Sequence, residues 1–242
     1  MFLTFKKWTA IYVLCLLGLF AGFAAILWHG SAINASKNIV LSGDDGVVLI
    51  VDPGHGGEDG GAVSTDGTPE AGINLAIALQ MKELAGFLGQ EIVLTRETDI
   101  SLHGETASTL AEKKRQDLQN RAAFCSEIEN GVLISIHQNS LPEFPDTRGA
   151  QVFYGAVEGS EVLAEGMQDV LNQTINVRAK TCRPMGDGVY LLEHAQCPAI
   201  LVECGFLSNE DELQQLKEES YQTKLAVILL SAAMDITDQP LE

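Results

Sequence analysis

The sequence predicts an α/β fold, a single three-layer domain in which a mostly parallel twisted sheet carries helices on both faces. Short runs rich in β-branched and aromatic residues alternate along the chain with longer segments whose apolar residues recur at helical spacing. Strands that alternate with helices of this length typically form such a sheet. At 242 residues, the chain is long enough for one domain with a closed core.

The expected elements begin with a strand and end with a helix. Five strands are expected, at residues 47–51, 92–95, 132–136, 150–154 and 199–202. Five helices are expected: the first contains apolar residues that recur at helical spacing from 73 to 88, and the others lie at residues 107–129, 160–172, 209–217 and 221–236. Gly89 follows the first of these helices and is placed as its C-cap.

The segment "DGTPEAGINLAIAL" indicates where the first helix starts. Thr68 is expected to be the N-cap, with Pro69 at the first helical position and Glu70 in the first turn. A carboxylate there gains ~0.3–1 kcal/mol from the helix dipole. A structural role would therefore be enough to explain Glu70 on its own, and a ligand role is the alternative.

The N-terminus has a different character from the rest of the chain. Residues 8–28 contain no charge, follow Lys6 and Lys7, and would span about 32 Å as a helix, close to the ~30 Å hydrocarbon core of a bilayer. The sequence predicts a membrane anchor at 1–28, with a signal peptide cleaved near residues 33–35 as the alternative. Residues 29–46 are expected to be a linker, and residues 47–242 an exported domain in the cell envelope.

The net charge of the chain excludes one class of partner. The 15 Lys and Arg against 33 Asp and Glu give a formal net charge of −18, which argues against nucleic acid as a partner.

Cys125, Cys182, Cys197 and Cys204 form no Cys-x-x-Cys pair. We expect them to be small buried hydrophobic residues, with a Cys182–Cys197 bridge as the alternative.

Ionisable residues follow three of the predicted strands. Asp52 and His55 come after the strand at 47–51, and His137 and Glu203 directly follow the strands at 132–136 and 199–202. Ligands bind beyond the carboxyl ends of the strands in open α/β sheets. If these three strands are parallel neighbours, His55, His137 and Glu203 converge at that edge.

Together with Glu70, these residues have the composition of a catalytic metal site. A single histidine after a strand is more often an ordinary satisfied polar group. Two histidines and one carboxylate, however, are a typical catalytic Zn²⁺ set that leaves the fourth position to water. The hypothesis assigns His55, Glu70 and His137 to one zinc ion and Glu203 to the general base.

The chain resembles a known family, the zinc-dependent N-acetylmuramoyl-L-alanine amidases of the amidase-3 type. The resemblance runs from about residue 47 to 236 and rests on ordered motifs: "VDPGHGGEDGGA", the Glu of "PEAGINLAIAL", "LTRETD", "LQNRAAF", "SIHQNS" and "VECGFLSN". It implies zinc ligands at His55, Glu70 and His137 and a catalytic Glu203. The family commonly has a basic residue after the ligand glutamate, whereas Ala71 stands there in this chain.

The resemblance implies that the substrate is peptidoglycan, cut between N-acetylmuramic acid and L-alanine. The segments "KKRQDLQNR", "GAQVFYG" and "VYLLEHAQCPAILVECGFLSN" are most similar to the spore-cortex, germination-associated branch. The glycines around His55 are expected to let a bulky glycan reach the metal. Whether an activating protein partner is needed stays open.

Several other polar residues receive minor roles. Asp52 is expected to shape its turn or support a ligand, and Asn139 to bind substrate or cap a strand end. Arg96 and Arg121 are expected to form structural ion pairs. Surface or packing roles are expected for His103 and His194, and an N-cap role for Ser208.

Two other functions compete with the amidase. One is a membrane-tethered wall-binding module without catalysis, and the other is a zinc peptidase that cuts within the stem peptide. The commonest peptidase motif, His-Glu-x-x-His, is absent, and so is a Gly-x-Ser-x-Gly elbow for a serine nucleophile.

Overall fold

A computed structural model describes residues 46–90, 92–186 and 188–237 of the chain. Their strands form a six-stranded sheet in the order β2-β1-β3-β6-β4-β5. The strands are β1 (Val48–Pro53), β2 (Ile92–Leu94), β3 (Gly131–Asn139), β4 (Gln151–Tyr154), β5 (Arg183–Pro184) and β6 (Ala199–Phe206). β1 pairs in parallel with β2 and β3, and β3 pairs in parallel with β6, whereas β4 is antiparallel to β6.

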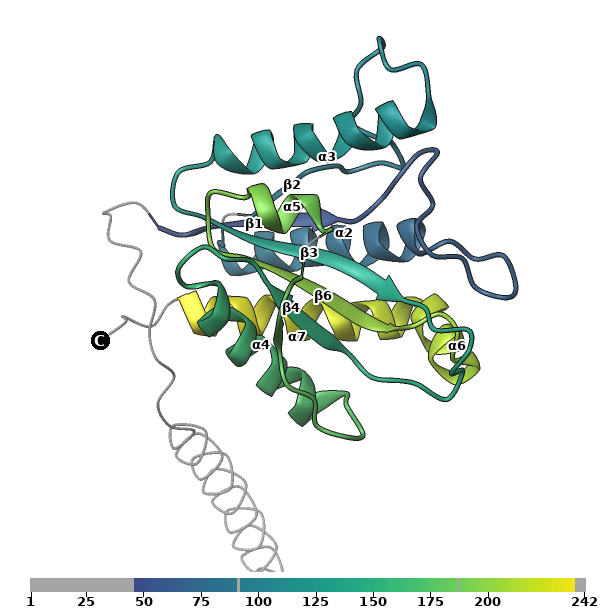
Figure 1. The fold of residues 1–242 in the computed structure, drawn as a ribbon. Coiled ribbons are helices and arrows are strands. Elements are labelled where there is room, and N and C mark those ends of the chain that lie inside the picture. Colours follow the sequence, from purple (N-terminus) through teal and green to yellow (C-terminus); the bar gives the residue numbers. More distant parts are fainter. Residues whose placement is uncertain (1–45, 91, 187, 238–242) are drawn as a thin grey trace, which may run out of the picture. The chain divides into compact units, whose positions relative to one another are not determined.

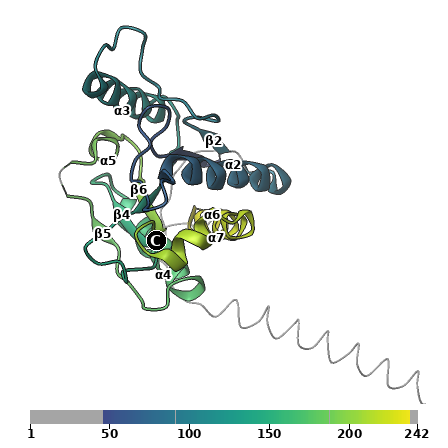
Figure 2. The same ribbon diagram turned by 90° about the vertical axis from the view of Figure 1, so that its right-hand side faces the viewer.

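Helices cover both faces of the sheet (Figure 1). They are α2 (Glu70–Leu88), α3 (Leu110–Ser126), α4 (Ser160–Thr174), α5 (Tyr190–His194), α6 (Glu210–Lys217) and α7 (Glu219–Thr237). The view in Figure 2 shows α3 and α5 on one side of the sheet, with α2, α6 and α7 on the other. The predicted single α/β domain with helices on both faces is therefore confirmed.

Side chains alternate between two hydrophobic cores along the central strands. Leu49 and Val51 of β1 pack into the core shared with α2, α4 and α7, while Ile50 between them packs into the core shared with α3 and α5. The same alternation places Leu133 of β3 and Leu201 of β6 on the α3 and α5 face. Their neighbours two residues along on the same face, Ser135 and Glu203, are polar.

The structure extends or corrects several expected boundaries. β3 continues to Asn139 and β6 to Phe206, so His137 and Glu203 lie inside their strands and do not follow them. β5 and α5 were not predicted, because elements of two and five residues are too short to show a period.

Two predicted helix caps are wrong by one residue. Pro69 holds the extended N-cap position of α2, while the Thr68 hydroxyl donates to the Asp66 carboxylate at 2.7 Å. Asn209 is the N-cap of α6 and accepts a hydrogen bond from a backbone amide, and Ser208 instead accepts one from the Leu141 amide. The Gly89 C-cap is confirmed, with a left-handed φ of 71°.

The predicted anchor and nearly all of the predicted linker lie outside the described residues. None of the described helices is both long and apolar enough to span a membrane. Cys125, Cys197 and Cys204 are buried as expected, Cys182 is half-buried, and all four are free. The alternative of a Cys182–Cys197 bridge is therefore wrong.

A buried charge network holds the end of β1. Arg121 of α3 lies 2.6 Å from Oδ1 of Asp52 and 2.8 Å from Oδ2 of Asp117, and all three side chains are buried. The Thr95 and Ser135 hydroxyls donate to the same Asp52 carboxylate at 2.6 and 2.7 Å. The ion pairs expected for Arg121 are confirmed, and they join α3 to the strand that leads into the site.

Arg96 is also buried, but among the described residues it forms no ion pair, so the prediction of one is wrong. Its guanidinium donates to four backbone carbonyl oxygens, those of Pro53, Gly54, Ala71 and Thr98, at 2.9–3.1 Å. It therefore cross-links the loop after β1 to the first turn of α2 through main-chain groups.

Asp52→Asn should destabilise the protein in a pH-dependent way. Burial raises the pKa of Asp52, but the Arg121 charge and the hydroxyl donors outweigh it and hold the pKa at about 2. Because the folded pKa lies below the ordinary value of 3.8, the stabilisation is present above about pH 4 and is lost as the pH falls toward 2. We expect Asp52→Asn to lower the free energy of unfolding by about 3 kcal/mol at pH 7, measured by chemical denaturation.

The difference between the parent and Asp52→Asn should shrink as the pH falls from 4 to 2. Asp211→Asn is the matched control, since it breaks an exposed pair with Arg148 and should change stability by less than about 1 kcal/mol. A loss of similar size in both variants, or one independent of pH, would contradict the assignment.

Candidate active site

The first candidate ligand, His55, lies on a tight loop directly after β1. Its φ of 62° is in the left-handed region, which a non-glycine residue rarely adopts. The Gly56 and Asp59 backbones exchange two hydrogen bonds of 2.8 and 3.2 Å and close the loop. Nη2 of Arg121 donates to the His55 carbonyl oxygen at 2.7 Å, so the buried network supports this backbone directly.

Glu70, the first residue of α2, is buried beside this loop. Its Oε1 accepts the Ala62 amide at 2.8 Å, and its Oε2 accepts the Gln138 amide at 2.7 Å and the Asn74 side chain at 3.3 Å. Three donors from three parts of the chain therefore fix the orientation of the carboxylate.

The two histidines lie against opposite oxygens of this carboxylate. Nε2 of His55 is 3.0 Å from Oε1 of Glu70, and Nδ1 of His137 is 3.5 Å from Oε2. The two rings meet edge to face with centroids 4.9 Å apart. One nitrogen or oxygen atom from each of the three residues lies within 4.8 Å of the others, so together they could hold a metal ion.

Two glycines leave room for the candidate ligands themselves. A Cβ on Gly54 would lie 2.3 Å from the His137 ring, and one on Gly61 would lie 2.3 Å from Oε1 of Glu70. The structure therefore corrects the expected role of these glycines. The space that a side chain would take is filled by His137 and Glu70, and it is not an approach for the glycan.

Glu203 of β6 pairs in register with His137 of β3. Its side chain is half-buried, and its Oε2 is buried with no hydrogen-bond partner in the part of the chain that the structure describes. Burial, together with the neighbouring Glu70 charge, raises the pKa of Glu203 to about 7, against the opposing effect of the two histidines. A carboxylate that lacks a partner and titrates near neutrality can accept or donate a proton there.

Burial sets the direction of the pKa shift in Glu203, whereas in His55 and Glu70 contacts with neighbouring charged groups outweigh it. Burial opposes protonation of His55, but hydrogen bonds to Asp59 and Glu70 outweigh it and raise the pKa of His55 to about 9. Burial also opposes ionisation of Glu70, yet His137 and His55 hold its pKa well below the ordinary value. Glu70 is thus held in its ionised form, and this carboxylate could bind a metal cation.

These residues line one cleft of about 410 Å³. Met185 and Val189, from the segment between β5 and α5, and Tyr190, the first residue of α5, form an apolar part of its lining. Lys114 of α3 and Asn139 of β3 also line it. A cleft with polar candidate ligands and an apolar side suits a substrate with both polar and apolar groups.

The remaining candidates lie around the site. Among the described residues, Asp52 forms no hydrogen bond or ion pair with the three candidate ligands, and it acts on the His55 backbone through Arg121. Oδ1 of Asn139 accepts the Ser140 amide at 2.7 Å. Neither His103 nor His194 lines the cleft. Nε2 of His103 lies 3.5 Å from Oε2 of Glu58, and the His194 ring stacks on Tyr190.

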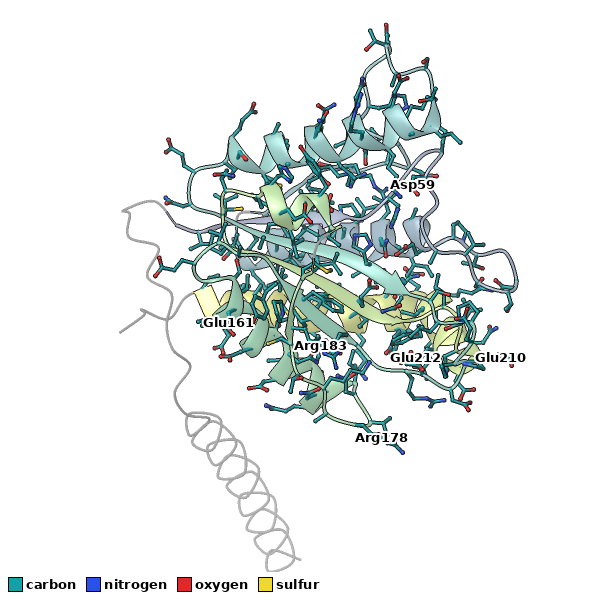
Figure 3. All side chains as sticks on the ribbon, viewed as in Figure 1. Asp59, Glu161, Arg178, Arg183, Glu210 and Glu212 are labelled. Carbon is teal, nitrogen blue, oxygen red and sulfur yellow. The ribbon has the colours of Figure 1, made fainter. Side chains whose placement is uncertain are left out.

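Sequence reasoning missed three residues that hold the site together: Asp59, Asn74 and Gln138. Oδ2 of Asp59 lies 3.0 Å from Nδ1 of His55, and Figure 3 labels Asp59 near α3, on the loop after β1. Asp59 stands four residues after His55 in "GHGGED", a spacing that could have identified it. Asn74 and Gln138 act on Glu70 through contacts that no local pattern indicates.

Comparisons with known proteins point to one family. Residues 49–233 match the N-acetylmuramoyl-L-alanine amidase family. The germination-specific N-acetylmuramoyl-L-alanine amidase of Bacillus subtilis is 32% identical over 181 residues, which cover 75% of this chain and 76% of that protein.

Solved structures show the same fold. The CwlD amidase from Clostridioides difficile, solved in complex with the GerS lipoprotein, is 36% identical with a TM-score of 0.75 and covers 79% of this chain and 98% of that one. The amidase AmiC2 of Nostoc punctiforme is 25% identical with a TM-score of 0.69, covering 81% and 100%. The family resemblance in the sequence is thus confirmed, and the chain belongs to the N-acetylmuramoyl-L-alanine amidase family.

Proposed function

We propose that this amidase uses one zinc ion, held by His55, Glu70 and His137, to cut the bond between N-acetylmuramic acid and L-alanine in peptidoglycan. One observation carries the proposal. Two histidines and a carboxylate present ligand atoms within 4.8 Å of one another, in a cleft that also contains Oε2 of Glu203, which has no hydrogen-bond partner among the described residues.

The residues fit zinc on three grounds. Two imidazoles and one carboxylate are a donor set that catalytic Zn²⁺ sites use, with a further position for water. Gly54 and Gly61 leave the space that the His137 and Glu70 side chains need. The buried Oε2 of Glu203 has no other partner in the described chain, which suits a group reserved for water or substrate.

When bound, zinc would polarise the scissile carbonyl and lower the pKa of a water molecule to about 7. Oε2 of Glu203 would take the proton from the attacking water and deliver it to the nitrogen of the departing L-alanine. Its fixed place on β6, opposite His137, holds that atom at the site throughout. The hydrogen bonds from Ala62, Gln138 and Asn74 keep Glu70 oriented toward both histidines.

We propose further that the enzyme acts in the cell envelope in spore-cortex maturation. The 32% identity to an amidase named germination-specific supports this role. The complex of the Clostridioides difficile relative with a lipoprotein supports a protein partner for this chain as well. The uncharged segment 8–28 is proposed to anchor the chain, with cleavage of a signal as the alternative.

Gly61→Ala should weaken zinc binding, because the new Cβ would press on Oε1 of Glu70. Gly67→Ala is the matched control. Gly67 also has a positive φ, 87° against 71° for Gly61, but nothing lies within 4 Å of its Cβ position. Both variants should lose about 1 kcal/mol of stability from backbone strain. We expect the zinc dissociation constant to rise at least about 10-fold in Gly61→Ala alone, measured by chelator competition. Equal affinities in the two variants would show that Gly61 does not shape the site.

Digestion of purified peptidoglycan by the full-length chain should release stem peptides with a free L-alanine amino terminus and leave the glycan intact. Mass spectrometry of the products identifies the new ends, and a chelator-treated sample is the control. Cuts within the stem peptide would favour the zinc peptidase, and wall binding without cleavage would favour the binding module. New reducing sugar ends would overturn the amide specificity.

A further inference from the structure

We propose that Asp59 is the positioning residue for the metal site: it holds the ring of His55 so that Nε2 is the atom offered to the metal. This inference rests on the proposed zinc site. It goes beyond the ligand set, because it says which nitrogen of His55 binds and what selects that nitrogen.

The two nitrogens of His55 face two different carboxylates. Nδ1 lies 3.0 Å from Oδ2 of Asp59, and Nε2 lies 3.0 Å from Oε1 of Glu70. An ionised carboxylate only accepts hydrogen bonds, so Nδ1 must carry a hydrogen to bond Asp59. In a ring that binds a metal, the other nitrogen must then be the ligand. Asp59 therefore selects Nε2.

Asp59 is itself held firmly enough to do this. Its backbone exchanges two hydrogen bonds with Gly56, and its Oδ1 accepts the Gly61 amide at 3.2 Å. Nζ of Lys114 lies 3.2 Å from its Oδ2 and ties the carboxylate to α3. One side chain thus closes the loop through Oδ1 and orients His55 through Oδ2.

His55 needs such a restraint because its backbone does not provide one for the ring. The left-handed φ of 62° places the residue on a loop of glycines, which pack no side chains against it. Arg121 donates to the His55 carbonyl oxygen, which fixes the main chain but does not act on the ring nitrogens. Asp59 and Glu70 are the two groups that bond its nitrogens.

The neighbouring Glu58 provides a matched control. It is also acidic and also bonds a lysine of α3, Lys113, but in the described part of the chain it forms no hydrogen bond or ion pair with His55. A change there removes a charge and a tether to α3 without touching the ring. Any effect of Asp59 that comes from loop charge alone should therefore also appear at Glu58.

The decisive experiment is a long-range ¹H–¹⁵N correlation spectrum of the full-length chain loaded with zinc, with His55 assigned by substitution. We expect zinc on Nε2 of His55 and a hydrogen on Nδ1. Zinc on Nδ1 would overturn the proposal while leaving the zinc site standing. A parent chain that binds no zinc would instead overturn the proposed function. Because the spectrum is recorded on the parent chain, the test does not depend on whether an Asp59 variant folds.

Zinc affinity of variants gives an independent readout. Asp59→Ala should raise the zinc dissociation constant about 10- to 100-fold, in the range expected for loss of such a partner. Asp59→Asn keeps an oxygen acceptor for Nδ1 and should lose less, whereas Glu58→Gln should bind zinc like the parent. Asp59→Ala with parent affinity, or an equal loss in Glu58→Gln, would contradict the assignment.

Discussion

The parallel register of β1, β3 and β6 is the constraint on which the site depends. It pairs Pro53 with Ile136 and His137 with Glu203, so the ends of three strands meet at one edge of the sheet. Successive residues point to opposite faces, and a slip of one residue would send His137 and Glu203 into the core packed against α2 and α7. The buried apolar residues of these strands therefore fix the catalytic geometry as well as the fold.

The loops add what the sheet cannot provide. His55 and Glu70 do not belong to strands, and buried polar contacts hold them: Arg121 on the His55 carbonyl, Arg96 on the carbonyls around the loop, and Gln138 on Glu70. These contacts use main-chain groups heavily, because a glycine-rich loop has few side chains to pack. The buried charged side chains Arg96 and Arg121 thus serve to hold the loop after β1 in shape.

The fold class, and the fact that His55, Glu70, His137 and Glu203 line one cleft, could be predicted from the sequence because the signals are local. Apolar runs of strand length marked β1, β3 and β6, and His55, His137 and Glu203 stand at or near their ends. The antiparallel direction of β4 and the presence of α5 could not be predicted, because they depend on pairing and packing between distant segments. The same holds for Arg96, which looked like an ion-pair residue but bonds carbonyls, and for Asn74 and Gln138, which reach Glu70 only in the folded chain.

The central claim is a division of labour between residues that hold the metal and one that moves a proton. Metal content by elemental analysis, measured beside turnover on wall fragments, tests it most directly in Glu203→Gln and His137→Ala. Glu203→Gln should keep about one zinc per chain and lose activity by roughly 10²–10⁴-fold, since only the basic carboxylate is removed. His137→Ala should lose both zinc and activity. A Glu203→Gln protein stripped of zinc, or one that remains fully active, would contradict the account.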